Sequence, residues 1–510
     1  MDIACSFPLF TILLCMISSP VCTLLKPRQA QHWTLCAETV MLGMSIGVLA
    51  YTLRTGAPFT YKLGEFPAPW GNELRAGPLE GLAACAFSGV LLCCVLGGAD
   101  YVRIDIDDRK QNLFYALVNL ASASLMALVW TNDLFTGYVF VEIMTLASCG
   151  MITARENGRT TLAAVRYMIM NLLGSGLFLL GVVLTYSLTG HLLMEPAHGE
   201  IAGIAAENGK VSLLFTITIM TVGLGIKSGM FPSYFWMPDT YGSATPTGAG
   251  ILSSLVSKGY LFLLLKIYLR VAGNDIWQTM PLRWVLMALG LMGMIGGSVS
   301  ALRSKSINRM TAYSSAAQIG YIYLGIGIGG TAGCTAAMFQ ILVHAVTKSL
   351  LFMTTPRLAA VSGESLLFER LRGSGRKAKA AGVFFTAAAL SMVGVPFFAG
   401  FSVKLFFGIA AAEYGSPVIL AAVMTVLGVS SILNALYFIR TVVLIYTGNR
   451  PGTKDAETNA ENVTPGADHL PPGSARYYIA ASALTIANLF LGLSAPSVVE
   501  VIRNGLAMFG

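Results

Sequence analysis

Six ionisable residues stand inside long apolar segments of this sequence, where a charge is costly. They are Glu142, Lys227, Lys258, His344, Lys348 and Lys404. A charged side chain at the centre of a bilayer costs roughly 2.5–3.5 kcal/mol on insertion scales, so such residues are retained for a reason. Amines and imidazoles in a low-dielectric site can take up and release protons as a neighbouring carboxylate changes its position or partner. The set therefore predicts proton movement along a row of groups at mid-membrane depth.

Structural interpretations of the same residues remain open. Glu142 and a lysine could form a buried ion pair that only holds the fold, and His344 could be a hydrogen-bonded core histidine. Long basic side chains near helix ends reach the membrane interface, and this is expected of Lys266, Arg270, Arg357 and Arg440. The carboxylates Glu38 and Glu80 also stand near the ends of apolar segments, and we expect them at the interface too.

The elements that carry these residues are predicted from the apolar segments. Of 510 residues, 55% are hydrophobic and only 11% are charged, whereas soluble domains are about a quarter charged. The apolar residues come in blocks of about 20, the length of a membrane-spanning helix. They predict an all-α integral membrane protein with about fourteen transmembrane helices, at residues 3–25, 33–54, 79–98, 112–130, 134–153, 163–187, 211–241, 246–270, 281–302, 308–329, 333–357, 379–411, 417–446 and 477–502.

Two of the predicted spans are interrupted, at Val222–Pro238 and at Leu390–Lys404. Proline removes a backbone donor and clashes with the preceding turn, so helix breaks are expected at Pro232 and Pro396. Because these are helices 7 and 12 of the predicted order, they are typical of a transporter built from two repeats. The predicted organisation is N-terminal helices 1–3 (1–110), a first repeat of helices 4–8 (111–272), a second repeat of helices 9–13 (273–447), a polar loop (448–476) and a C-terminal helix 14 (477–510).

The charges in the loops predict an orientation. Lys and Arg concentrate in the loops after odd-numbered helices, which the positive-inside rule places in the cytoplasm. We therefore expect a multi-pass protein of the cell inner membrane with both termini outside. The nine cysteines include no CxxC pair, and the sequence has no cofactor loop and no basic stripe with interleaved aromatics. No cofactor, no metal and no nucleic-acid partner are expected, and the surroundings are the lipid bilayer.

Four stretches of the sequence resemble a known family: TNDLFTGYVFVEIMTLAS, GIKSGMFPSYFWMPDTYGSATPTGAGILSSLVSKGYLFLL, KSINRMTAYSSAAQIGYI and HAVTKSLLF. They are similar to the antiporter-like subunits of respiratory complex I, of Mrp-type cation/proton antiporters and of membrane-bound hydrogenases, over roughly residues 80–450. The resemblance implies a fourteen-helix fold with two inverted five-helix repeats. It also implies that Glu142 and Lys227 form the pair that steers proton transfer, and that Lys258, His344 and Lys404 continue a hydrated axis. Subunits of this family hold no redox centre and work beside other membrane subunits in a larger complex.

Departures from the family pattern bear on the type of complex. The complex I M-type subunit carries a glutamate at the position of Lys404, and complex I homologues often carry a histidine at that of Gln318. Both features look more like the Mrp D-type subunit or the related hydrogenase subunit, although SYF before WMPD departs from the usual Leu-His. We expect an ion-translocating subunit, moving protons or exchanging Na⁺ for H⁺, in an Mrp-type antiporter or energy-converting hydrogenase complex, with no catalytic centre of its own. The alternatives are a proton-pumping subunit of a complex I-type NADH:quinone oxidoreductase, a passive membrane anchor and a stand-alone small-solute transporter.

Overall fold

Long apolar segments form helices because backbone polar groups in lipid must pair within their own segment. The computed structural model describes residues 3–66, 71–206, 209–363, 365–448 and 474–509. Within these ranges, 12 helical spans are long and apolar enough to cross a membrane, which confirms the predicted all-α integral membrane fold. The number fourteen and the inverted repeats stay predictions. The predicted polar loop 448–476 lies almost entirely outside the described residues.

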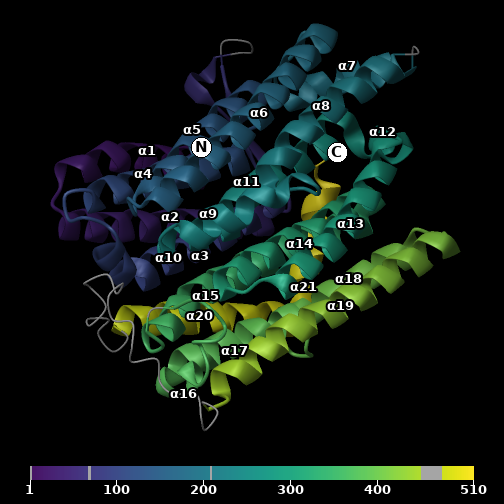
Figure 1. Ribbon diagram of the computed structural model, residues 1–510. Coiled ribbons are helices and arrows are strands. Elements are labelled where there is room, and N and C mark those ends of the chain that lie inside the picture. Colours follow the sequence, from purple (N-terminus) through teal and green to yellow (C-terminus); the bar gives the residue numbers. More distant parts are fainter. Residues whose placement is uncertain (1–2, 67–70, 207–208, 364, 449–473, 510) are drawn as a thin grey trace.

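The N-terminal part consists of three long helices and a small hairpin (Figure 1). Pro27 and Pro78 each begin a helix, at the position where the missing N–H is not needed. The hairpin pairs Phe59 with Ala76 in an antiparallel register. In chain order the elements are η1 (Ile3–Ser6), α1 (Phe7–Leu24), α2 (Pro27–Thr55), β1 (Phe59–Lys62), η2 (Leu63–Glu65), β2 (Glu73–Ala76) and α3 (Pro78–Asp105).

The middle of the chain contains the first interrupted span and two π-helical segments. Its elements are α4 (Gln111–Trp130), α5 (Leu134–Thr153), α6 (Gly158–Thr189), α7 (Met194–Ala206), α8 (Lys210–Ser228), η3 (Ser233–Trp236), α9 (Met237–Ser243), α10 (Pro246–Ile251), η4 (Leu252–Val256), α11 (Ser257–Lys266), η5 (Ile267–Gly273) and α12 (Asn274–Thr279). The segments η4 and η5 are π-helical, so the span over 246–279 is wound unevenly along its length.

The last part of the chain contains the second interrupted span. Its elements are α13 (Leu282–Arg303), α14 (Ile307–Ile328), α15 (Gly330–Ala360), α16 (Ser374–Lys377), α17 (Lys379–Val393), α18 (Ala399–Glu413), α19 (Pro417–Tyr446), α20 (Ala475–Leu493) and α21 (Ala495–Ala507). The C-terminal span, predicted as one helix over 477–502, is divided at Ser494, and Pro496 lies in the first turn of the new helix, where its missing N–H is not needed. Both C-terminal helices, yellow in Figure 1, return to the middle of the molecule and pack on α3 and α15.

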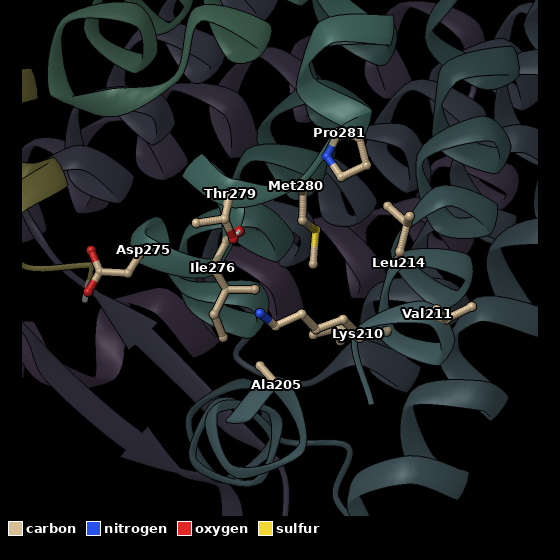
Figure 2. Close-up of a pocket in the computed structure, with 10 residues that line it drawn as sticks. Ala205, Lys210, Val211, Leu214, Asp275, Ile276, Thr279, Met280 and Pro281 are labelled. Carbon is tan, nitrogen blue, oxygen red and sulfur yellow. Dashed lines mark hydrogen bonds between the residues drawn. The ribbon is translucent and has the colours of Figure 1, made fainter. Parts of the chain in front are cut away.

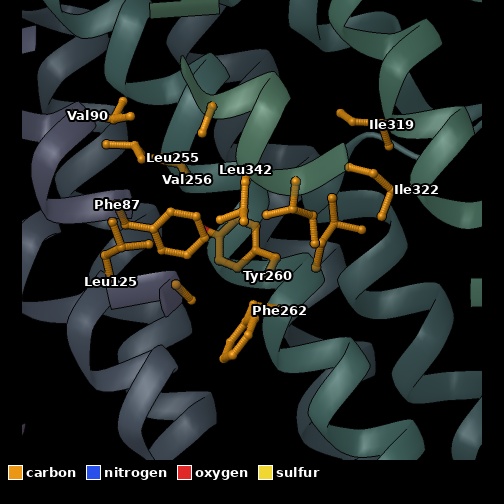
Figure 3. Close-up of a cluster of buried hydrophobic side chains, with 14 of the residues drawn as sticks. Phe87, Val90, Leu125, Leu255, Val256, Tyr260, Phe262, Ile319, Ile322 and Leu342 are labelled. Atoms are coloured by element: carbon orange, nitrogen blue, oxygen red, sulfur yellow. The ribbon is translucent and has the colours of Figure 1, made fainter. Parts of the chain in front are cut away.

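Two spans lie at the centre of the bundle, and they carry three of the six ionisable residues. In the span Pro246–Thr279 and in α15, every residue of the most apolar 18-residue window is buried. Lys258 belongs to the first span, and His344 and Lys348 belong to the second. Figure 3 shows apolar side chains of α3, α4, η4, α14 and α15 gathered around Tyr260 of α11. These residues are therefore enclosed by protein and not by lipid.

In both interrupted spans, the helix before the break ends with the same backbone geometry. Gly229 and Gly394 follow α8 and α17 in the left-handed conformation, with φ of +81° and +89°, which glycine adopts without strain. The next N–H in each case bonds back five residues, from Met230 to the Gly225 carbonyl at 2.9 Å and from Val395 to the Leu390 carbonyl at 3.0 Å. This is the Schellman pattern of helix ends. Each glycine thus leaves a helix C-terminus inside the bundle.

Candidate functional site

Lys227 lies in the last turn of α8, directly before the first break. Its side chain is 0% exposed, and its ammonium donates to the Thr145 hydroxyl on α5 at 2.7 Å. The ammonium also lies 5.4 Å from the centre of the Tyr260 ring, within range of a cation–π contact. Thr145 in turn donates to the Val141 carbonyl at 2.9 Å, and its oxygen lies 3.3 Å from the Tyr260 hydroxyl. One hydroxyl group and one aromatic ring therefore hold this amine.

Glu142 stands one helical turn before Thr145 on the same face of α5. It is half-buried, and its buried Oε1 has no hydrogen-bond partner in the described structure. Among the described residues no ion pair within 4.0 Å joins Glu142 to Lys227. The carboxylate is close enough for its charge to act on Lys227, but Thr145 occupies the position of the direct partner.

Lys258 is the second residue of α11, the α-helical segment that follows the π-helical segment η4. It is 0% exposed, and its ammonium donates to the backbone carbonyl of Ser253. The Ser253 hydroxyl lies 2.9 Å from that of Ser315 on α14. One turn of irregular helix thus supplies both the carbonyl for Lys258 and a hydroxyl contact to the next helix.

His344 and Lys348 lie one turn apart on α15, and both are buried. The Lys348 ammonium donates to the Thr311 carbonyl at 2.9 Å and to the Ser314 hydroxyl, both on α14. The His344 ring has no hydrogen-bond partner on either nitrogen in the described structure. The charges of Lys258 and Lys348 both act on this ring. The structure therefore does not support the hydrogen-bonded core histidine as an explanation of His344.

Lys404 comes from α18, beyond the second break, and its ammonium donates to the carbonyl of Val393, the last residue of α17. It is half-buried. A small cavity of about 10 Å³ separates Lys404 from His344, which is room for one water molecule. The cavity is also lined by Gln318 and Gln340, whose side chains are joined at 2.6 Å. The polar lining and the size suit a water between the two basic groups.

Pro232 and Pro396 both lie in the interruptions, between α8 and η3 and between α17 and α18. The structure thus brings Lys227 and Lys404 each to the end of a broken helix. Lys258, His344 and Lys348 lie on the two enclosed spans. Glu142 lies to one side of Lys227, on α5.

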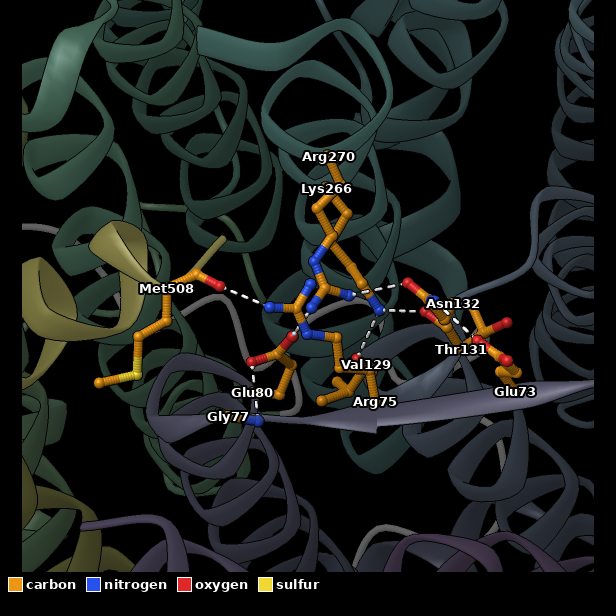
Figure 4. A network of polar contacts seen from close by, with 10 residues as sticks. All are labelled: Glu73, Arg75, Gly77, Glu80, Val129, Thr131, Asn132, Lys266, Arg270 and Met508. Atoms are coloured by element: carbon orange, nitrogen blue, oxygen red, sulfur yellow. Dashed lines mark hydrogen bonds and ion pairs between the residues drawn. The ribbon is translucent and has the colours of Figure 1, made fainter. Parts of the chain in front are cut away.

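The interfacial prediction was wrong for five residues. Lys266 and Arg270 are 0% and 4% exposed, and Glu38, Glu80 and Arg357 are buried as well. Arg270 forms an ion pair with Glu80 at 3.1 Å, and Lys266 donates to the Val129 and Thr131 carbonyls at 2.8 and 2.5 Å. Figure 4 shows these groups beside Arg75, which reaches the Met508 carbonyl near the C-terminus. Arg357 is paired with Asp100 at 2.7 Å.

One sequence signal could have identified the first of these networks. Lys266 and Arg270 are four residues apart, so they share one face of the span. Two cations on one face of an apolar helix require acceptors on a neighbouring element. The N-terminal Glu80 and the 129–132 turn supply them.

A much larger cavity lies away from the buried lysines. It has a volume of about 410 Å³ and is lined by residues of α7, α8 and α12 and by Met280 and Pro281, which precede α13. Figure 2 shows its lining, in which Lys210 points inward and the Asp275 carboxylate lies at the far side. None of the six ionisable residues of the site lines it. The large volume of this cavity is therefore no evidence that it belongs to the site of the six ionisable residues.

Comparisons with known proteins give consistent results. A family model described as "NADH:quinone oxidoreductase/Mrp antiporter, TM" matches residues 131–429. The chain is 32% identical to the N subunit of the NADH-quinone oxidoreductase of Desulforudis audaxviator (strain MP104C), over 87% of this chain and 85% of that one. It is 26% identical to the D-type subunit of the Na(+)/H(+) antiporter of Bacillus subtilis (strain 168), over 70% of each. A chain of the Mrp complex from Dietzia sp. DQ12-45-1b has the same fold, with a TM-score of 0.86 at 23% identity over 99% of this chain and 97% of that chain.

Proposed function

The chain belongs to the NADH:quinone oxidoreductase/Mrp antiporter transmembrane family, and on that basis we propose that it moves protons across a membrane as one subunit of a multisubunit assembly. One observation carries the proposal: Lys227, Lys258 and Lys348 are 0% exposed, and none is within 4.0 Å of a carboxylate in the described structure. A buried cation without a counter-ion is strongly destabilising. Buried amines without a counter-ion can exchange their protons. Membership of a structural ion pair does not account for the presence of these three lysines.

The proposed path comprises Glu142, Lys227, Lys258, His344, Lys348 and Lys404. Hydroxyl groups stand between the amines. The Thr145 and Tyr260 hydroxyls adjoin Lys227, and the Tyr241 hydroxyl lies 3.1 Å from Ser257, the residue before Lys258. A hydroxyl can accept one proton while it releases another. The last step, from His344 to Lys404, would cross the small cavity by way of a water.

Glu142 would act as the gate of this path. Its charge reaches Lys227, yet the amine is bound by Thr145. A carboxylate that approaches stabilises the charged amine, and one that withdraws favours proton release. Because Glu142 is half-buried and its Oε1 has no partner among the described residues, it is free of competing bonds on that oxygen.

We also propose that the chain contains two repeats and has both termini on the outer face. The matching Schellman ends at Gly229 and Gly394 support the repeats. The described ends of the chain meet at the hairpin, because η1 packs on β1 and the Met508 carbonyl accepts from Arg75 of β2. Both ends therefore belong to one face, opposite the basic loops.

The relatives support two types of assembly. Similarity to an oxidoreductase N subunit and to an antiporter D-type subunit fits either a quinone-reducing complex or a cation/proton antiporter. Lys404 and Gln318 are the features that favour the Mrp-type or hydrogenase-type assembly over the M-type subunit of complex I. A passive anchor and a stand-alone transporter have no specific observation in their favour.

Substitution of Lys227 tests the proposed function. The assembly containing Lys227→Ala is reconstituted into vesicles, and proton uptake is measured with a pH-sensitive dye. We expect uptake to be abolished while the subunits still assemble. Lys210→Ala is the matched control, because Lys210 is exposed at the other end of the same helix. Wild-type uptake with Lys227→Ala would refute the proposed function.

A further inference from the structure

The C-terminal helix α20 covers the second break, although it belongs to neither of the two predicted repeats. At Gly492, near the end of α20, an added Cβ would lie 2.3 Å from the Phe397 carbonyl oxygen and 2.9 Å from the Ala399 nitrogen. Only glycine allows the two backbones to approach this closely. The Ser402 hydroxyl of α18 also donates to the Gly492 carbonyl, at 3.4 Å. The end of α20 is therefore packed directly on the start of α18.

The backbone of the second break needs support from its surroundings. Phe397 has φ of +74°, in the left-handed region that a bulky residue rarely adopts unless neighbouring structure holds it there. The next residue, Phe398, is the N-cap of α18 and makes no side-chain bond to the first turn, because a phenyl ring has no acceptor for an N–H group. The Ala399 N–H belongs to that first turn, whose N–H groups have no partner within their own helix. The start of α18 therefore depends on another element for its hydrogen bonding.

Asn488 of α20 supplies this partner. Its side chain is 2% exposed, and its Oδ1 accepts from the Ala399 N–H at 3.4 Å. Its Nδ2 donates to the Thr347 hydroxyl oxygen of α15 at 2.8 Å, and Thr347 donates its own hydrogen to the Val343 carbonyl at 2.7 Å. Each of the three bonds uses a different hydrogen atom. The orientation of the amide follows from them, because a backbone N–H can only donate.

The small cavity that separates His344 from Lys404 has walls from both of the helices that Asn488 joins. On α15 the lining includes Val343, the acceptor of the hydroxyl that Asn488 binds. On α18 it includes Gly400, which follows the residue whose N–H Asn488 accepts. Asn488 is outside this lining. It therefore touches neither basic group and can act on them only through the positions of α15 and α18.

We propose that Asn488 is a positioning residue for the last step of the proton path, and that it holds α18 against α15 so that one water connects His344 with Lys404. This inference rests on the proposed function. In that step the charged His344 ring releases a proton to the water, and the water releases a proton to the neutral Lys404 amine. No electron is transferred, and Asn488 exchanges no proton. A displacement of about 1 Å can lower a rate about 100-fold, so the loss of this connection should slow the step.

Substitutions at both ends of the connection test the inference in the assembled complex. Asn488→Leu has a similar size but makes neither bond, and we expect it to lower proton uptake at least tenfold. Thr347→Val removes only the bond on α15 and should also lower uptake. The double variant should lose no more than Asn488→Leu alone, because both substitutions break one connection. Thr485→Val is the control and should leave uptake unchanged, since this hydroxyl donates to the Ala481 carbonyl of α20 itself.

Two results of these uptake measurements would overturn the inference. One is wild-type uptake by Asn488→Leu. The other is a double variant in which the two losses multiply, because Asn488 and Thr347 would then act independently. If Asn488→Leu does not assemble, Thr347→Val and its control carry the test.

A solvent isotope effect distinguishes positioning from a merely structural role. Uptake is measured in light and in heavy water, and the ratio of the two rates is compared with that of the wild type. If α18 is displaced, proton transfer across the cavity limits the rate, and the ratio should rise in Asn488→Leu and in Thr347→Val. A lower rate with an unchanged ratio would mean only that less active complex is present, and it would refute the positioning role. Normal transport by Lys227→Ala would instead refute the proposed function, so the two failures are distinguishable.

Discussion

Removing either charge of the buried Glu80–Arg270 pair should destabilise the protein more than removing both. Glu80→Gln leaves the Arg270 guanidinium beside the Lys266 ammonium with no carboxylate at 3.1 Å. Arg270→Met leaves the Glu80 carboxylate without its cation. The double variant leaves neither charge uncompensated.

The magnitude follows from the distance and the burial. Two unit charges 3.1 Å apart interact by about 5 kcal/mol at an effective dielectric constant of about 20. Measured losses on breaking one side of a buried pair are about 3–5 kcal/mol, whereas replacing the whole pair with apolar residues is often nearly neutral. We expect each single variant to lose about 3–5 kcal/mol of unfolding free energy. The double variant should lose less than the sum by about 3 kcal/mol or more, which is the coupling free energy.

The assay is denaturant unfolding of the purified protein in detergent micelles, followed by tryptophan fluorescence. Glu500→Gln is the control, because Glu500 is exposed on α21, which packs on α3, the helix that carries Glu80. Additive losses in the double variant would refute the reasoning. Such a result would mean that the two side chains are not coupled, and that the network only fills space.

The remaining predictions concern the proposed path. Glu142→Gln should reduce proton uptake in reconstituted vesicles almost as much as Lys227→Ala, because the gate needs a carboxylate that can approach and leave; unchanged uptake would exclude Glu142 from the path. Gly394→Ala should lower the unfolding free energy by about 1–3 kcal/mol, because φ is +89° and an added Cβ would lie 2.8 Å from the Lys404 ammonium nitrogen. Its control is Gly428→Ala on α19, where an added Cβ meets no atom within 4 Å, and equal stability of the two variants would contradict the prediction.

The position of a residue along its helix could be predicted from the sequence, because it can be counted from the two ends of the apolar segment. Lys227, Lys258 and His344 stand far from any such end, and the structure has them buried. Both breaks were also predictable, since glycine and proline mark them locally. Glu38 was expected at the interface but is buried, because α4 covers this face of α2 and Ser122 of α4 bonds the carboxyl group.

The burial of a residue by segments that are distant along the chain could not be predicted from the sequence. Arg270 does stand near the end of its span, but Glu80 of α3 and the Phe509 ring, 4.5 Å from the guanidinium, enclose it. These contacts join residues about 190 and 240 positions away along the chain. The choice of Thr145 over Glu142 as the partner of Lys227 depends on a single turn of α5. Periodicity places both on one face, and it cannot choose between them.

Both breaks place a lysine ammonium near a helix C-terminus, but the lysine comes from a different side of the break in each case. A helix C-terminus carries a partial negative charge of about half a unit and is stabilised by a nearby cation. At the first break the cation belongs to the helix that ends there, because Lys227 lies in the last turn of α8. At the second break it comes from the following helix, because Lys404 of α18 donates back to the Val393 carbonyl at the end of α17. A glutamate at position 404 could not make this bond, since an ionised carboxylate and a carbonyl oxygen are both acceptors. The lysine at this position therefore fits the local backbone as well as the proposed path, and a family member with glutamate here would need a different arrangement of its second break.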